Sequence, residues 1–346
     1  MARGRPSRAT VYRRLEKATR DLCERFGGLP SPKESESIWS DIWHQEAHHS
    51  TALEGNTLVI KEVEKLLDQG RAVGAKPLKD YMEVKGYADA ARWVYGQALD
   101  PDGWSSQGLI TVNEVRRIHH MTMTPVWDVA PHPDATDKEG PGCLRQHDIH
   151  PFDQGTTPPS WPLVPARLSG WVDRVNAERP RDTSGDGTAP PLPEHLAQLN
   201  SQFEQVHPFL DGNGRTGRLA LNLILVRLGY PPVVIFKRQR DAYLAALGKS
   251  DAGDFGPLGE LIARAMLDNL NRFIIPNVAG PARLVPLAAL ADEHLSVAAL
   301  RQAAQRGRLD AIQGPDGVWQ SSRRAVRDYQ RSRHKRRSRP NNLSPD

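Results

Sequence analysis

The chain has 346 residues, a formal net charge of +5 and two cysteines. This length suits two domains, and two cysteines exclude a disulfide framework or a cysteine-based zinc site. No apolar run reaches the roughly 18 residues of a membrane span, and the basic N-terminus lacks the apolar stretch of a secretion signal. These features predict a cytoplasmic protein without membrane contact.

Helical periodicity dominates the chain as far as residue 275. It predicts a short helix over residues 10–25, further helices over 34–99, an amphipathic helix over 111–121 and more helices over 194–275. Residues 179–193 are rich in Gly, Pro, Ser and Asp, which predicts a flexible insertion. The chain is therefore predicted to contain an N-terminal helical region (1–100), a helical core (101–275), a linker (276–282), a small C-terminal domain (283–332) and a basic disordered tail (333–346).

Glu54 lies at the predicted C-terminal end of one of the early helices, where a negative charge is unfavourable. Glu54 follows a helical stripe and precedes Gly55, which predicts the end of that helix. A carboxylate at the negative end of a helix dipole is unfavourable unless a cation lies nearby. The alternative is an exposed glutamate in water, which is common on protein surfaces. The residue alone leaves both interpretations open.

Residues 142–161 precede the core helices and combine Gly, Pro, His and Asp. Their strand propensity is poor, and the prolines would allow only short edge strands. An ordinary surface loop is the alternative. The segment contains His147, Asp148, His150 and Asp153. Their spacing matches no zinc pattern, which favours solvated loop residues over a metal cluster.

The segment over residues 207–218 has the most concentrated chemistry. Apolar residues at helical spacing on both sides predict two buried helices joined by this loop. Its glycines let the backbone approach an anion, and the start of the second helix presents free N–H groups. Arg215 and Arg218 add fork-shaped cations for phosphates. Asp211 suits Mg²⁺, and His207 has a resting pKa suited to a general base. A plain turn between helices is the alternative.

Residues 207–218 also resemble the signature of the Fic family, His-x-Phe-x-Asp/Glu-Gly-Asn-Gly-Arg-x-x-Arg, at every specified position. The resemblance implies an all-α core with a β-hairpin flap. It implies transfer of AMP from ATP to a Ser, Thr or Tyr hydroxyl of a target protein, the enzyme itself included. By this resemblance, His207 deprotonates the hydroxyl, Asp211 binds Mg²⁺ and Phe209 anchors the loop. The implied phosphate ligands are Gly212, Asn213 and Gly214 for the α-phosphate and Arg215 and Arg218 for the β- and γ-phosphates.

Two further segments resemble parts of the same family. The run from Ser50 to Asn56 is similar to the inhibitory motif Ser/Thr-x-x-x-Glu-Gly/Asn of one subclass. The resemblance implies that Glu54 pairs with Arg218 and blocks productive placement of the γ-phosphate. Residues 142–161 resemble the family's flap, a hairpin that covers the nucleotide and aligns the target by strand addition, with Arg145 as a flap residue.

The segment after the linker resembles a winged helix-turn-helix of the excisionase or MerR kind. A helix and turn over residues 287–296, a helix over 297–306, a hairpin around 314–317 and a last helix over 323–331 follow in order. Arginines concentrate in the last helix and the tail, which suits double-stranded DNA. A small helical cap, or a domain that binds protein or its own copy, is the alternative.

Two classes of function therefore compete. The first is a protein adenylyltransferase that Glu54 inhibits. The second is a DNA-binding transcriptional regulator whose Fic core only senses nucleotide. His207 favours the first, because a sensor has no need for a base. We therefore predict an all-α Fic-type enzyme, followed by a small winged helix-turn-helix-like domain.

Overall fold

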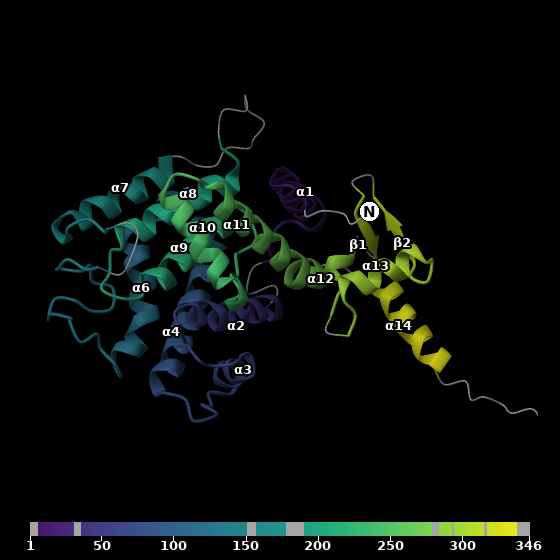
Figure 1. Ribbon diagram of the computed structural model, residues 1–346, viewed down its shortest axis with the longest axis horizontal. Helices are drawn as coiled ribbons and strands as arrows, with labels where there is room; N and C mark the ends of the chain where they lie inside the picture. Colours follow the sequence, from purple (N-terminus) through teal and green to yellow (C-terminus); the bar gives the residue numbers. More distant parts are fainter. Residues whose placement is uncertain are drawn as a thin grey trace, which may run out of the picture. The chain divides into compact units, whose positions relative to one another are not determined.

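The computed structural model describes residues 6–30, 36–150, 157–177, 190–278, 284–292, 294–314 and 317–337. The chain divides into two compact units, the first ending at Leu267 and the second starting at Asp268 (Figure 1). Most of the predicted flexible insertion, much of the predicted linker and the tail from residue 338 lie outside the described residues. No helix of the described part is both long and apolar enough to cross a membrane.

Helices make up the first unit, as the periodicity predicted. In chain order they are α1 (Arg8–Phe26), α2 (Glu36–Leu53), α3 (Ile60–Gln69), α4 (Leu78–Ala98), α5 (Pro101–Trp104), α6 (Val112–Trp127), η1 (Trp161–Leu163), α7 (Val164–Ala177), α8 (Leu192–Val206), α9 (Asn213–Arg227), η2 (Lys237–Gln239), α10 (Arg240–Asp251) and α11 (Gly256–Asn269). The helix predicted over residues 111–121 begins as expected and continues to Trp127. Thr111 and Glu114 form a reciprocal capping box that fixes its start.

The core of the first unit surrounds α9. Nearly every residue of this helix is buried, its arginines and asparagines included, so α9 lies in the interior of the unit. It packs against α2, α4, α6 and α8. α4 and α6 approach each other closely at Gly86. Any side chain at this position would collide with the backbone carbonyl of Thr122 on α6. The loop between α8 and α9 therefore joins two helices that the core holds firmly.

The second unit contains short helices and a small sheet. Its elements are η3 (Leu270–Ile274), α12 (Ile275–Val278), β1 (Val285–Pro286), η4 (Leu287–Ala289), α13 (Val297–Gln305), β2 (Ala311–Gln313), β3 (Trp319–Ser321) and α14 (Arg323–Arg337). The strands are antiparallel in the order β1-β3-β2, with Ile312 opposite Gln320. The predicted hairpin is thus confirmed, and the predicted helices over 297–306 and 323–331 correspond to α13 and α14.

Three features of the second unit differ from prediction. Residues 287–296, predicted as a helix followed by a turn, have that order, but the helical part is only the single turn η4. Asp292 offers a reason, since its Oδ1 accepts the backbone N–H groups of His294 and Leu295 and so favours a turn. The short strand β1 was not predicted. α14 continues to Arg337, past residue 333 where the tail was predicted to begin.

The flap differs from the predicted β-hairpin. Residues 142–150 and 157–160 contain no strand, and the residues between them lie outside the described part of the chain. Pro158, Pro159 and Pro162 have no N–H to give to a sheet. Some backbone groups of the flap bond to side chains instead of to another strand. For example, Asp148 accepts the N–H of Trp161 at 2.7 Å. The described flap is therefore a loop anchored by side chains.

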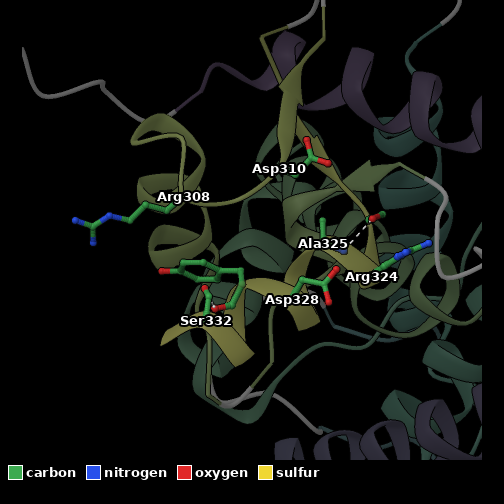
Figure 2. A pocket seen from close by; sticks show the side chains of 8 residues that line it. Arg308, Asp310, Arg324, Ala325, Asp328 and Ser332 are labelled. Atoms are coloured by element: carbon green, nitrogen blue, oxygen red, sulfur yellow. Dashed lines mark hydrogen bonds between the residues drawn. The ribbon is translucent and has the colours of Figure 1, made fainter. Parts of the chain in front are cut away.

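One hollow of about 330 Å³ lies in the second unit, beside α14 (Figure 2). Its lining consists of Arg308, Asp310, Ser322, Arg324, Ala325, Asp328, Tyr329 and Ser332. Two aspartates offset its two arginines, so the hollow does not concentrate charge of one sign.

Candidate active site

The loop between α8 and α9 is shaped by two residues in the left-handed region. His207 has φ 46° and ends α8, and Gly212 has φ 76° and precedes α9. A Cβ at Gly212 would lie 2.6 Å from the Sδ of Met123, so both the angle and the space require glycine. The loop thus leads directly into the start of α9, where the first backbone N–H groups of a helix are available to bind an anion.

Asn213 braces this loop from within. Its Oδ1 accepts the N–H of Phe209 at 2.9 Å, and its Nδ2 donates to the carbonyl of Phe209 at 2.8 Å. Both side chains are buried, and Phe209 is fully so, as its predicted anchoring role requires. The Asn213 amide was predicted to hold the α-phosphate, whereas here both its oxygen and its nitrogen bond to the loop. Its geometry therefore gives Asn213 a bracing role that the motif alone did not indicate.

His207 has the properties of a base at neutral pH. Its Nδ1 lies 3.3 Å from the carbonyl oxygen of Glu204. A carbonyl can only accept, so Nδ1 carries the hydrogen and Nε2 has the lone pair in the neutral ring. Burial is the main cause that lowers the pKa of His207 to about 4. The imidazole is therefore neutral at pH 7 and able to take a proton through Nε2.

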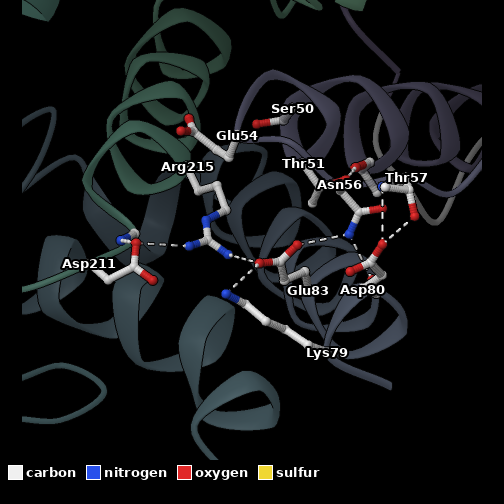
Figure 3. A network of polar contacts seen from close by, with 12 residues as sticks. Ser50, Thr51, Glu54, Asn56, Thr57, Lys79, Asp80, Glu83, Asp211 and Arg215 are labelled. Atoms are coloured by element: carbon white, nitrogen blue, oxygen red, sulfur yellow. Dashed lines mark hydrogen bonds and ion pairs between the residues drawn. The ribbon is translucent and has the colours of Figure 1, made fainter. Parts of the chain in front are cut away.

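Arg215 lies buried between two carboxylates (Figure 3). Its Nη2 contacts Asp211 Oδ1 at 3.2 Å, and its Nη1 lies 3.5 Å from Glu83 Oε1. Among the described residues, its Nε and Nη1 atoms are buried without a hydrogen-bond partner. Buried donors without acceptors are costly, so a further hydrogen-bond acceptor would stabilise this guanidinium, although two carboxylates already face its charge. Glu83 was not predicted, because it comes from α4 and carries no motif.

Asp211 is the residue of the loop that could hold Mg²⁺. Its side chain is 40% exposed, and both hydrogen bonds that it accepts go to Oδ1, from Gly212 and Arg215. Burial opposes its ionisation, but Arg215 and the Gly212 N–H outweigh burial and lower the pKa of Asp211. No group of three or more potential metal-ligating side chains occurs in the described part of the chain. One ionised carboxylate fits an ion that arrives with phosphate oxygens and water as its other ligands.

Arg218 is held by the end of α2. Its Nη2 donates to Glu54 Oε1 at 2.7 Å and to the carbonyl of Ser50, and its Nε donates to Ser50 Oγ at 2.7 Å. Arg218 is buried, and Glu54 is 40% exposed. Although burial disfavours its charge, the pairing with Arg218 lowers the pKa of Glu54. The structure therefore brings together the two residues that the inhibitory motif predicted to pair, and Glu54 is not a solvated glutamate.

Gly214 makes this ion pair possible. A Cβ at that position would lie 2.6 Å from Glu54 Oε1 and 3.0 Å from Arg218 Nη1. Any side chain at Gly214 would therefore push Glu54 away from the arginine. The same residue opens the backbone at the first turn of α9, where an anion would approach.

The base of the flap is held by two buried side chains. Glu139 accepts the backbone N–H groups of Thr136 and Gln146 and contacts the His147 ring. Arg145 is buried and directs its guanidinium at backbone carbonyls. Only Arg145 was singled out from the sequence, and Glu139 was missed because an isolated glutamate in a loop gives no signal.

His119 is a further residue that the sequence did not reveal. Its ring stacks on Phe209 with the ring centroids 3.7 Å apart and the planes 2° apart. Its Nδ1 accepts the N–H of Gly142, so its Nε2 donates to the carbonyl of Asp211 at 3.0 Å. Burial lowers the pKa of His119 to about 3, which keeps the ring neutral. His119 therefore links the flap base to the loop, and a lone histidine on an apolar helix face could not have shown this.

Comparison with known proteins agrees with this geometry. The model of the Fic/DOC family matches residues 109–225. Protein adenylyltransferase fic-1 of Caenorhabditis elegans is 27% identical over 273 residues, which is 79% of this chain and 49% of that protein. Protein adenylyltransferase Fic of Drosophila melanogaster is 27% identical over 68% of this chain and 42% of that protein. The chain thus spans about half the length, or less, of these curated relatives.

Solved structures show the same fold. The structure of C. elegans Fic-1, residues 134–508, has a TM-score of 0.60 at 25% identity and covers 77% of this chain and 72% of that one. A Fic-domain-containing signaling protein of Bacteroides thetaiotaomicron has a TM-score of 0.59 at 24% identity and covers 77% of this chain and 97% of that one. The match to the Fic/DOC family covers residues 109–225, and the predicted Fic fold is confirmed.

Proposed function

We propose that the protein transfers AMP from ATP to a Ser, Thr or Tyr hydroxyl of a target protein, its own chain included. The observation that carries the proposal is the buried guanidinium of Arg215, whose unsatisfied donors lie at the start of α9. Such donors at a helix N-terminus suit phosphate oxygens. Arg218 stands one turn further along the same helix, which gives room for a polyphosphate. The names of the curated relatives also support this activity.

The residues suggest a direct displacement at the α-phosphorus. Nε2 of His207 takes the proton of the target hydroxyl, and the hydroxyl oxygen forms a bond to the α-phosphorus. The bond from that phosphorus to the oxygen bridging to the β-phosphate breaks, and pyrophosphate leaves. Arg215 and Arg218 hold the β- and γ-phosphates, and the N–H groups of Gly212 and Gly214 stabilise the α-phosphate. Asp211 would hold Mg²⁺, which supplies positive charge to the phosphates when bound.

Glu54 would inhibit this reaction. A γ-phosphate that binds Arg218 must displace the carboxylate that now lies 2.7 Å from Nη2. Two anions cannot share that face of one guanidinium without strong repulsion. Nucleotide would therefore bind in a pose that the hydroxyl cannot attack.

Incubation with differently labelled ATP tests the activity. We expect the Glu54→Gly protein with Mg²⁺ to attach label from [α-³²P]ATP to itself or to lysate proteins, and no label from [γ-³²P]ATP. Label from the γ-position would indicate a kinase. Absence of label from both, with ATP still bound, would favour the nucleotide-sensing regulator.

For the second unit we propose contact with double-stranded DNA. The exposed face of α13 contains Arg301, Gln302 and Gln305, and the exposed Arg306 and Arg308 follow it. On α14, burial and the neighbouring Arg327 lower the pKa of Arg323, which indicates crowded positive charge. The antiparallel hairpin of β2 and β3 would serve as the wing. The acidic residues of the hollow beside α14 make it less suited to phosphate than the face of α13.

This second proposal predicts salt-dependent binding. Residues 268–346, expressed alone, are expected to bind a DNA duplex with a log–log salt slope of about 0.9 for each phosphate contacted. Arg306→Ala should lower that slope by roughly one, because the exposed arginine neutralises one phosphate. Fluorescence anisotropy at several salt concentrations measures both. A folded unit that binds no duplex at low salt would support a protein-binding domain instead.

A further inference from the structure

Arg145 is the most completely enclosed cation of the first unit's flap region. Its side chain is 0% exposed. Nε donates to the carbonyl of His207 at 2.9 Å, Nη1 donates to the carbonyl of His147 at 3.0 Å, and Nη2 donates to the carbonyl of Pro159. Its own backbone N–H donates to the carbonyl of Pro208 at 3.0 Å. One guanidinium therefore joins both described ends of the flap to the start of the loop that follows α8.

The contact with His207 falls on a strained residue. Within the described part of the chain, His207 is the only residue other than glycine with a positive φ. Its N–H bonds to Phe203 as the last turn of α8 closes, and its carbonyl accepts from Arg145. A histidine keeps such a conformation only where its surroundings fix it. The hydrogen bonds on either side of its Cα set the direction in which the imidazole leaves the backbone.

We infer that Arg145 is a positioning residue of the proposed AMP transfer, which holds the backbone of His207 so that Nε2 meets the target hydroxyl beneath the flap. The inference rests on the proposed function. Arg145 does not reach substrate itself, because its side chain is enclosed and Nε, Nη1 and Nη2 all donate to backbone carbonyls. The planar fork matters, because the single ammonium of a lysine cannot hold three carbonyls in fixed directions.

The charge of Arg145 gives a second way to detect this role. Burial lowers the pKa of His207 most, and the charge of Arg145 lowers it further, whereas the Glu204 carbonyl and the charges of Glu54 and Asp211 raise it. Asp148, 3.8 Å away and exposed, and Glu139 face Arg145 from the flap. Loss of the Arg145 charge should therefore raise the pKa of His207. Because the base must be neutral, the acid limb of kcat/KM would then move to higher pH.

The test uses the full chain with Glu54→Gly as the parent, so that inhibition does not mask the rates. The variants are Arg145→Lys, which keeps a cation, and Arg145→Met, which removes it. Arg116→Met is the matched control, because Arg116 Nε also donates to a flap-base carbonyl, that of Gly142 at 2.8 Å, without contacting His207. Melting temperature and ATP binding are measured for each, followed by incorporation of [α-³²P]AMP as a function of ATP concentration and pH.

We expect both Arg145 variants to lower kcat about 10- to 100-fold, because a small misplacement of a reacting group costs this much. KM for ATP should stay within about twofold, and the acid limb should move upward in Arg145→Met alone. Unchanged kcat in Arg145→Lys would overturn the inference, as would an equal loss in Arg116→Met or a loss of ATP binding in Arg145→Lys. A parent that binds ATP but transfers no AMP would instead refute the proposed function itself.

Discussion

In the Glu54→Gly background, His207→Ala is expected to lower AMP transfer by about 10²–10⁴-fold while ATP still binds. The reason is geometric. His207 ends α8 and precedes the residues proposed to bind phosphate, all of which lie from Gly212 onward. The pKa of His207, about 4, leaves its Nε2 unprotonated at neutral pH. The His207→Ala variant therefore loses a group that is ready to accept a proton. Incorporation of [α-³²P]AMP and calorimetric titration with ATP measure the two properties.

An exposed histidine in the second unit provides the control. His294→Ala should transfer AMP at the parent's rate, since the side chain is exposed and belongs to the other unit. If His207→Ala also kept the parent's initial rate, the hydroxyl would not depend on this imidazole. Another group would then have to take the proton, and the proposed mechanism would be wrong at its first step.

Much of the loop could be predicted because its requirements are local. Helical spacing on both sides of residues 207–218 indicated two buried helices, and both α8 and α9 are found. The left-handed Gly212 and the crowded Gly214 explain why those positions are glycine. Glu54 at a helix end was compatible with a nearby cation or with water; the Fic resemblance implied Arg218, and the two side chains lie 2.7 Å apart. Each of these inferences concerned a conformation or a charge that a short segment reveals.

The supporting residues could not be predicted because their partners are distant in sequence. Glu83 on α4 forms an ion pair with Arg215, and His119 on α6 donates a hydrogen bond to the backbone carbonyl of Asp211. A single glutamate or histidine on a buried helix face has no pattern that distinguishes it from a structural residue. The described residues of the flap form no strand for a related reason. Its backbone groups bond to side chains such as Arg145, and such pairings appear only once the fold is known.

Asn56 shows how the end of α2 extends its contacts beyond Glu54 (Figure 3). Its Nδ2 donates to Glu83 Oε2 at 2.8 Å, and Glu83 in turn contacts Arg215. The turn after α2 is therefore connected to both arginines, to Arg218 through Glu54 and to Arg215 through Glu83. A change at this turn should therefore alter the contacts of both arginines that are proposed to bind phosphate.

Glu54→Gly is expected to raise AMP transfer, self-modification included, by at least about tenfold over the wild-type chain. Glu54 is held at Arg218 by an ion pair of 2.7 Å, and the pairing keeps its carboxylate charged. Without that carboxylate, Arg218 is free to hold a γ-phosphate. Because Glu54 is 40% exposed, solvent weakens the pair. A bias of about 1.4 kcal/mol between the blocked and free arrangements already corresponds to a tenfold change in population.

Three companion variants separate the causes of this gain. Glu54→Gln keeps the size but not the charge, so a similar gain would assign inhibition to the ion pair. Ser50→Ala removes the acceptor of the Arg218 Nε bond and should release inhibition only in part. Arg218→Ala should show no gain, because it removes the guanidinium proposed to hold the γ-phosphate together with its ion pair to Glu54. Equal transfer by the wild type and Glu54→Gly would refute inhibition by Glu54.

The assay must also distinguish faster addition from slower removal of AMP. If the wild-type enzyme also removed AMP with the help of Glu54, net modification would rise in Glu54→Gly without any gain in the forward rate. A single-turnover measurement that starts from unmodified protein and excess [α-³²P]ATP reports addition alone. We expect the forward rate itself to rise, because Arg218 is the group that Glu54 occupies and a correctly held γ-phosphate is needed only for addition. An unchanged forward rate would mean that the ion pair does not restrain productive ATP binding.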